Sequence, residues 1–270
     1  MSFRFSRVAV LTLAGAVLLA PLATEAALIP IQVTGFNQDV IVETGAVDDP
    51  TTHYQSAITA SMDNGVTRTG NAWYERGFNT AAPTTGVPNG GVVTVSESDP
   101  TLSFVLQSAT TNNALLLDTA NSSGRLTLTT PVPMTRLAIL AASGNGGVTS
   151  APVTVNFSDG TPAASLTYTA GDWFNQNPIA VTAMGRVNAS AGTVNNVGAA
   201  NPRLYNQTLL DLTGFGTHPV ASLDFGWNGT GNTHTAIMAL SGETIVPEPA
   251  TPALLAVAAF GLFARRRRTA

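Results

Sequence analysis

Val153-Thr154-Val155-Asn156-Phe157 is followed by Ser158-Asp159-Gly160-Thr161 and then by Ser165–Thr169. The first run alternates apolar and polar residues, which is the pattern of a strand with one buried face. An Asp-Gly pair favours a tight reversal of the chain, and the third run is again rich in β-branched and aromatic residues. These seventeen residues therefore predict an antiparallel β-hairpin.

Similar short segments, separated by Gly, Pro, Asn, Asp and Ser, continue on both sides of this hairpin from Ile31 to Ser241. Two of them are Arg125–Thr130 and Thr135–Ala142. No stretch in this interval has the spacing of a long amphipathic helix. About a dozen short strands at regular spacing predict an all-β protein with a single antiparallel β-sandwich, jelly-roll-like in topology.

The longest turn-rich stretches are Gly65–Gly91, Asn145–Pro152 and Met184–Arg203. They exceed the length of tight hairpin turns, so we expect any binding surface to lie on them. Within the second stretch, Gly144-Asn145-Gly146-Gly147 follows an apolar segment. No lysine and no helix follow it, and the pattern therefore predicts a turn rather than a phosphate-binding loop.

The predicted domain, residues 27–245, has an unusual charge composition. It contains six arginines and fourteen acidic residues, a net charge of −8, and the whole sequence contains neither lysine nor cysteine. An acidic surface without lysine disfavours binding to phosphate backbones, so no nucleic-acid partner is expected. The composition also excludes Schiff-base, Ser–Lys and thiol chemistry as well as disulfides and thiolate metal sites.

The first 26 residues have the three zones of a secretory signal peptide. Arg4 and Arg7 supply the positive charge, Val8–Ala20 is apolar, and Thr24 and Ala26 occupy the −3 and −1 positions of a cleavage site. The apolar run is shorter than the roughly 20 residues of a membrane-spanning helix. We expect export through the Sec translocon and removal of this segment by signal peptidase.

Residues 246–270 form a tail in three parts: Val246-Pro247-Glu248-Pro249, the apolar run 250–264, and Arg265-Arg266-Arg267-Arg268. The apolar run predicts a short C-terminal transmembrane helix, with the arginine block as its cytoplasmic stop under the positive-inside rule. The two prolines keep the preceding segment extended. The tail therefore predicts a transient anchor beside an accessible cleavage site.

This tail resembles the PEP-CTERM sorting signal of Gram-negative bacteria in the order, spacing and position of its parts. The resemblance implies recognition by an exosortase, a membrane-embedded cysteine protease-transpeptidase that cuts near Pro247-Glu248-Pro249. It also implies an inner-membrane precursor, delivery to the cell surface or extracellular matrix, and association with exopolysaccharide in a biofilm.

Aromatic residues are the next candidates for function. Trp73, Tyr74 and Arg76 lie in a turn-rich stretch, where exposed rings can stack on sugars and polar neighbours can bond the hydroxyls. Separately, Asn156–Thr161, Asp172-Trp173-Phe174 and Pro202–Tyr205 resemble a pattern in galactose-binding-like accessory sandwiches, over roughly 136–243. That resemblance implies mainly structural roles for the Asp-Gly and Asp-Trp elements.

Acidic residues suggest two further hypotheses. A structural Ca²⁺ would use carboxylates in the first part of the chain; the candidates are Asp39, Asp48, Asp49 and Asp63. A glycosidase would need two facing carboxylates; the candidates are Asp48, Asp49, Glu75, Glu97, Asp99 and Asp172. His53, His218 and His234 lack the spacing of a zinc motif.

The sequence favours a non-catalytic, exported surface or matrix protein, with no cofactor other than an optional structural Ca²⁺. The first alternative is a carbohydrate-binding module for extracellular polysaccharide. The second is a glycan-active enzyme. The metal site, the ligand and the oligomeric state stay open.

Overall fold

The computed structural model describes residues 28–79, 84–88, 91–94, 102–174, 176–182, 184–197 and 201–244. Strands dominate this part of the chain, and its only helical elements are two 3₁₀ turns, η1 at Gln55–Ala57 and η2 at Thr213–Phe215. The all-β prediction is confirmed. The predicted signal peptide (1–26) and tail (246–270) lie outside the described residues.

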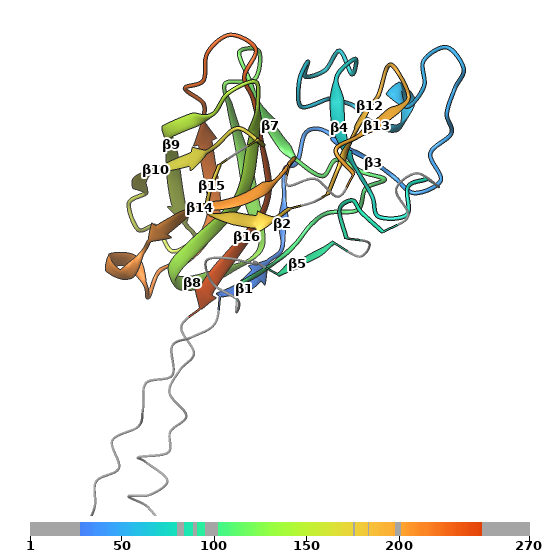
Figure 1. Ribbon diagram of the computed structural model, residues 1–270. Helices are drawn as coiled ribbons and strands as arrows, with labels where there is room; N and C mark the ends of the chain where they lie inside the picture. Colours follow the sequence, from blue (N-terminus) through green and yellow to red (C-terminus); the bar gives the residue numbers. More distant parts are fainter. Residues whose placement is uncertain are drawn as a thin grey trace, which may run out of the picture.

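One strand of 22 residues, β8 (Ser123–Gly144), organises the main sheet. Its first half pairs with β15 (Pro219–Gly226) and β2 (Val33–Thr34). Its second half pairs with β16 (His234–Thr244) and β14 (Leu204–Asp211). The sheet therefore folds over along β8 into two layers, which can be followed in Figure 1.

The change of partners falls at a proline. Pro133 is paired with Pro219 of β15, whereas the next residue, Met134, is paired with Thr244 of β16. Proline lacks the N–H needed for a continuous ladder, so it is tolerated where pairing changes. The sequence predicted two strands, Arg125–Thr130 and Thr135–Ala142. This was wrong in one respect, because the backbone stays extended through the prolines.

The first layer continues from β15 through β9 (Val148–Phe157) to β10 (Ala164–Ala170). β9 and β10 form the predicted hairpin, with Ala164 paired to Val155. At its turn Gly160 has φ +84, and the Asp159 carboxylate accepts a hydrogen bond from the Thr161 N–H at 3.0 Å. The Asp-Gly prediction is confirmed.

The second layer contains β16 at its centre, flanked by the second half of β8 and by short strands. These short strands are β1 (Leu28–Ile31), β7 (Leu115–Leu117) and, beyond β14, β11 (Ile179–Val181). Side chains from the inner faces of both layers form one core, which includes Leu126, Ile139, Val155, Leu223, Phe225 and Ile237. This arrangement is a β-sandwich; the jelly-roll topology stays a prediction.

The outer face of the second layer is also covered. A four-stranded sheet lies to one side of the sandwich (Figure 1) and consists of β3 (Ile41–Val42), β4 (Asn71–Tyr74), β12 (Arg186–Asn188) and β13 (Thr193–Asn195). The hairpin of β5 (Val92–Thr94) and β6 (Ser103–Val105) contributes to the same cover. Because β16 is covered on both faces, its residues 235–242 are all buried.

Candidate functional site

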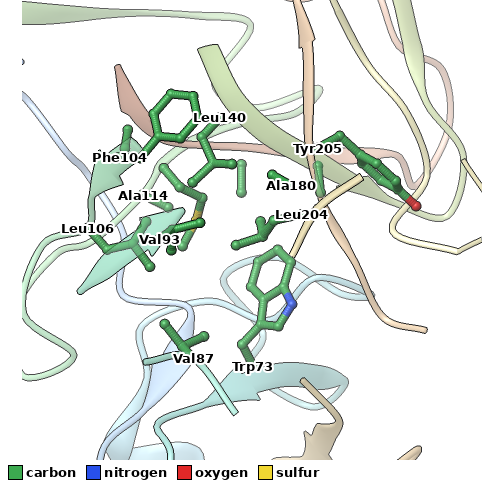
Figure 2. Packing of buried hydrophobic residues seen from close by; sticks show 14 of the residues in the cluster. Trp73, Val87, Val93, Phe104, Leu106, Ala114, Leu140, Ala180, Leu204 and Tyr205 are labelled. Carbon is green, nitrogen blue, oxygen red and sulfur yellow. The ribbon is translucent and has the colours of Figure 1, made fainter. Parts of the chain in front are cut away.

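The residues predicted to bind sugar lie in the interior. Trp73 and Tyr74 belong to β4, and neither has exposed surface. Figure 2 shows Trp73 within the cluster that also holds Leu140 and Leu204. A ring must expose a face to stack on a sugar, so this placement conflicts with the predicted role for both rings. Arg76 is exposed, and its role stays a prediction.

The contacts of the two rings explain the burial. The Trp73 ring meets the Trp173 ring edge to face, with centroids 5.1 Å apart. Tyr74 stacks on Phe78 at 5.4 Å, and its hydroxyl lies 2.8 Å from the Thr85 hydroxyl. The Trp73 ring therefore joins the four-stranded sheet to the sandwich, whereas Tyr74 packs in the four-stranded sheet's own core. Both have a structural role of the kind that buried aromatics usually have.

The four aspartates considered for calcium have separate structural partners. Asp48 contacts His53 at 2.7 Å, and Asp49 accepts the N–H groups of Thr51 and Thr52 at 2.8 Å. Asp63 accepts the backbone N–H of Asn71 at 3.1 Å. Among the residues that the structure describes, no three acidic or histidine side chains gather closely enough to hold a metal ion. The structure does not bring these carboxylates into one ligand set.

Asp39 is the buried member of that group, with 8% of its surface exposed. Its carboxylate accepts hydrogen bonds from the Ile41 N–H at 3.1 Å and from the Asn113 side-chain amide at 2.5 Å. Burial raises the pKa of Asp39 to about 7, and the nearby charge of Glu43 adds to the effect. Asn113 also accepts the Val40 N–H at 3.0 Å, so the pair ties the segment before β3 to the segment before β7.

The carboxylates considered for glycoside hydrolysis also have structural partners. Asp172 accepts the Gly146 N–H at 2.6 Å and the Phe174 N–H at 2.9 Å. Glu75 accepts the Thr44 N–H at 2.9 Å. Glu97 and Asp99 lie outside the described residues. The bonds of Asp172 agree with the structural role that its Asp-Trp resemblance implies.

The histidines lie in different parts of the fold. His218 contacts Asp159 at 2.8 Å beside the β9–β10 turn, and this contact helps to hold the pKa of Asp159 at about 2. His234 begins β16, where burial lowers its pKa although Asp118 and Asp63 act in the opposite direction. His53 pairs with Asp48 in a separate loop.

A shallow cavity of about 310 Å³ opens at the end of the β9–β10 hairpin opposite to its turn. We call it the hairpin groove. Gly146–Thr149 lines one side, and Thr169, Gly171, Asp172 and Gln176 line the other. The Asp172 carboxylate links the two sides because it accepts a hydrogen bond from the Gly146 N–H. The sequence predicts a turn at Gly146 and Gly147, but no local pattern in it indicates that Thr169 and Gln176 lie opposite them.

The second feature is the end of the sheet at which the described chain begins and stops. β1 and β16 are antiparallel, with Leu28 paired to Glu243. The first and the last described residues, Leu28 and Thr244, therefore lie at the same end of the sheet (Figure 1). Arg136 of β8 binds the Glu243 carboxylate from the other side.

Comparison with known proteins identifies the segment that follows. Residues 246–268 match the model of the PEP-CTERM protein-sorting motif. The chain thus carries this motif directly after an all-β body, and the motif indicates an exported protein that an exosortase processes. No curated protein and no solved structure matches the chain.

Three sets of predicted residues lie outside the part that the structure describes: Thr24 and Ala26, Val246–Pro249, and Arg265–Arg268. The same holds for the predicted helix 250–264. Within the described ranges, no helix is long and apolar enough to cross a membrane.

Proposed function

We propose that this protein is a non-catalytic component of the cell surface or extracellular matrix, associated with exopolysaccharide. Its signal peptide, cut after Ala26, carries the body across the inner membrane. The apolar run 250–264 and the block Arg265–Arg268 then hold the precursor there. Exosortase cleavage near Pro247-Glu248-Pro249 releases the body to the exterior.

The PEP-CTERM match over residues 246–268 is the observation that carries this proposal. The position of that match supports it, because only Ile245 separates Thr244, the last residue of β16, from Val246. Since Leu28 lies on the neighbouring strand and is paired with Glu243, the body begins and stops at the same end of the sheet. The opposite surfaces of the sandwich are then available for contacts in the matrix.

The hydrogen bonds of the acidic residues support a non-catalytic role. Asp49, Asp172 and Glu75 each accept backbone N–H groups that stabilise turns or strand ends. Such bonds occupy carboxylate oxygens that a general acid or base would use toward a substrate. Incubation of the purified protein with the polysaccharide of the producing cells should release no reducing sugar ends.

Fractionation of producing cells tests the route. When cells produce the full chain, the processed body is expected in the extracellular polysaccharide fraction. When they produce a chain that ends at Thr244, that chain should be exported but stay in the periplasm. Equal distribution of both chains would contradict sorting by the tail. Recovery of the released body in the medium, free of polysaccharide, would contradict the association with the matrix.

A further inference from the structure

The hairpin groove has a fixed shape. Gly146 has φ +118, a conformation that other residues rarely adopt. A Cβ on Gly147 would lie 3.0 Å from the carbonyl oxygen of Ala170, so glycine lets the two backbones approach closely. The Gly171 carbonyl accepts the Ser143 N–H at 2.8 Å, which fixes the second side to the end of β8. A groove held in this way loses little conformational freedom when a ligand binds.

The side chains in the groove offer a neutral set of hydrogen-bonding groups. Thr149 and Gln176 are exposed, and within the described part of the chain neither the Thr149 hydroxyl nor the Gln176 side-chain amide makes a hydrogen bond. The Thr169 hydroxyl accepts the Ser150 N–H at 3.4 Å and keeps its own proton for donation. Hydroxyl and amide groups both donate and accept.

The charges in the groove narrow the class of ligand. Asp172 is the single ionisable residue among the described lining residues, and both carboxylate oxygens already accept backbone N–H groups. No arginine or histidine is among its described lining residues, and the Arg203 guanidinium beside it donates to the Gln176 carbonyl at 3.0 Å, so the charge that an anionic ligand would face in the groove is the Asp172 carboxylate. In the described part of the lining, Val148 is the single large apolar residue and is buried, so an apolar ligand would gain little. A neutral ligand rich in hydroxyl groups fits this set best.

We propose that the hairpin groove binds one or two neutral sugar units of an extracellular polysaccharide. This inference rests on the proposed function, which supplies the polymer. Hydroxyls of the sugar exchange hydrogen bonds with Thr149, Thr169 and Gln176. Because no aromatic ring is among the described lining residues, binding to a single unit is weak. Many repeats along one polymer raise the apparent affinity.

The test uses the full chain in a mild detergent that contains no sugar, run in native gels that hold a polysaccharide. Three probes are compared: dextran as a neutral glucan, the polysaccharide purified from the producing cells, and polygalacturonate as an anionic polymer. Dextran and the purified polysaccharide are expected to retard the protein, whereas polygalacturonate is not. Thr149→Val and Gln176→Ala should each weaken the retardation at least tenfold.

Two matched variants serve as controls. Thr193→Val changes an exposed threonine on β13, and Gln107→Ala changes a half-buried glutamine beside β6; both lie away from the groove. Circular dichroism melting verifies that all four variants fold. Unchanged retardation of the two groove variants would overturn the proposal, as would retardation by polygalacturonate alone or by none of the probes.

The outcomes separate this inference from the proposed function. If groove variants lose retardation while the wild-type chain stays in the inner membrane of producing cells, the groove proposal holds and the route fails. If groove variants remain in the extracellular polysaccharide fraction at wild-type levels and keep their retardation, the groove proposal fails and the route stands.

Discussion

Arg136 Nε donates a hydrogen bond to the carboxylate of Glu243 across the pair formed by β8 and β16. Glu243 is one residue from the end of the last strand, and on its other side it is paired with Leu28. The Arg136–Glu243 ion pair therefore attaches the last residues of β16, which precede the sorting tail, to β8, the central strand of the sandwich.

Replacing Arg136 by methionine should lower the free energy of unfolding by about 1–2 kcal/mol, because the Glu243 side chain is only 15% exposed and loses a charged partner. Arg125→Met is the matched control. Its pair with Asp224 is more exposed, and Asp224 keeps a bond from Asn156, so a loss below about 0.5 kcal/mol is expected. Urea unfolding measures the stability of both variants. Equal losses of stability would contradict a special role for the Arg136–Glu243 pair at the end of β16.

Trp73→Ala should destabilise the protein by about 3–5 kcal/mol, since a fully buried ring leaves a cavity between the small sheet and the sandwich. Trp227 is only half-buried, and Trp227→Ala should cost less. Urea unfolding of both variants checks this. A Trp73→Ala protein with wild-type stability but impaired sugar binding would show that the ring acts as a ligand platform instead.

Asp39 should make stability depend on pH. Since burial raises its pKa from 3.8 to about 7, the folded state keeps a proton that the unfolded chain releases between these values. The contribution of Asp39 to the free energy of unfolding is therefore fully present below about pH 4. It falls as the pH rises toward 7, by at most ~1.4 kcal/mol per pH unit. Asp39→Asn keeps an acceptor for the Ile41 N–H and removes the titration.

The comparison of wild type with Asp39→Asn isolates this group from the other titrating residues. Unfolding in urea at pH 5 and at pH 8 should show the variant gaining stability relative to wild type at the higher pH. A difference that is the same at both pH values would mean that Asp39 titrates normally in the folded state.

Asp172→Ala should lower the free energy of unfolding by about 1–3 kcal/mol, because the N–H groups of Gly146 and Phe174 lose their acceptor. Asp211→Ala is the control, since within the described residues that exposed carboxylate bonds only Thr213. Thermal melts compare the two. If Asp172→Ala destabilises the protein as little as Asp211→Ala does, the structural role of the Asp172 carboxylate is contradicted.

The tail supports a prediction about sorting. Glu248→Ala, or replacement of Arg265–Arg268 by glutamine, should leave the body folded but keep it at the inner membrane, because recognition or membrane orientation is lost. Cell fractionation with an antibody against the body measures this. Release of either variant at the wild-type rate would rule out processing through the motif.

Local signals in the sequence were sufficient for part of the fold. The β9–β10 hairpin follows from alternation and an Asp-Gly turn within seventeen residues, and the structure has it in the expected place. The passage of β8 through Pro131 and Pro133 was not predictable in this way. It depends on β15 and β16, which lie about a hundred residues further along the chain.

The candidate sites show the same limit. Trp73 lies in a turn-rich stretch, but Trp173 and Met184, about a hundred residues later in the chain, belong to the cluster that buries it. The hairpin groove brings Gly146 and Asp172 into direct hydrogen-bond contact, beyond an irregularity of the β9–β10 pairing between Tyr168 and Ala170. By contrast, the sorting motif is contiguous in sequence, so Val246–Pro249 could be recognised without any knowledge of the fold.

Mass spectrometry of the mature termini, on protein isolated from fractions of the producing cells, tests the central claim most directly. A body that begins at Ala27, ends near Val246-Pro247 and is found outside the cell is the predicted result. A chain that is intact through Ala270 and remains in the inner membrane would contradict processing and delivery by the tail.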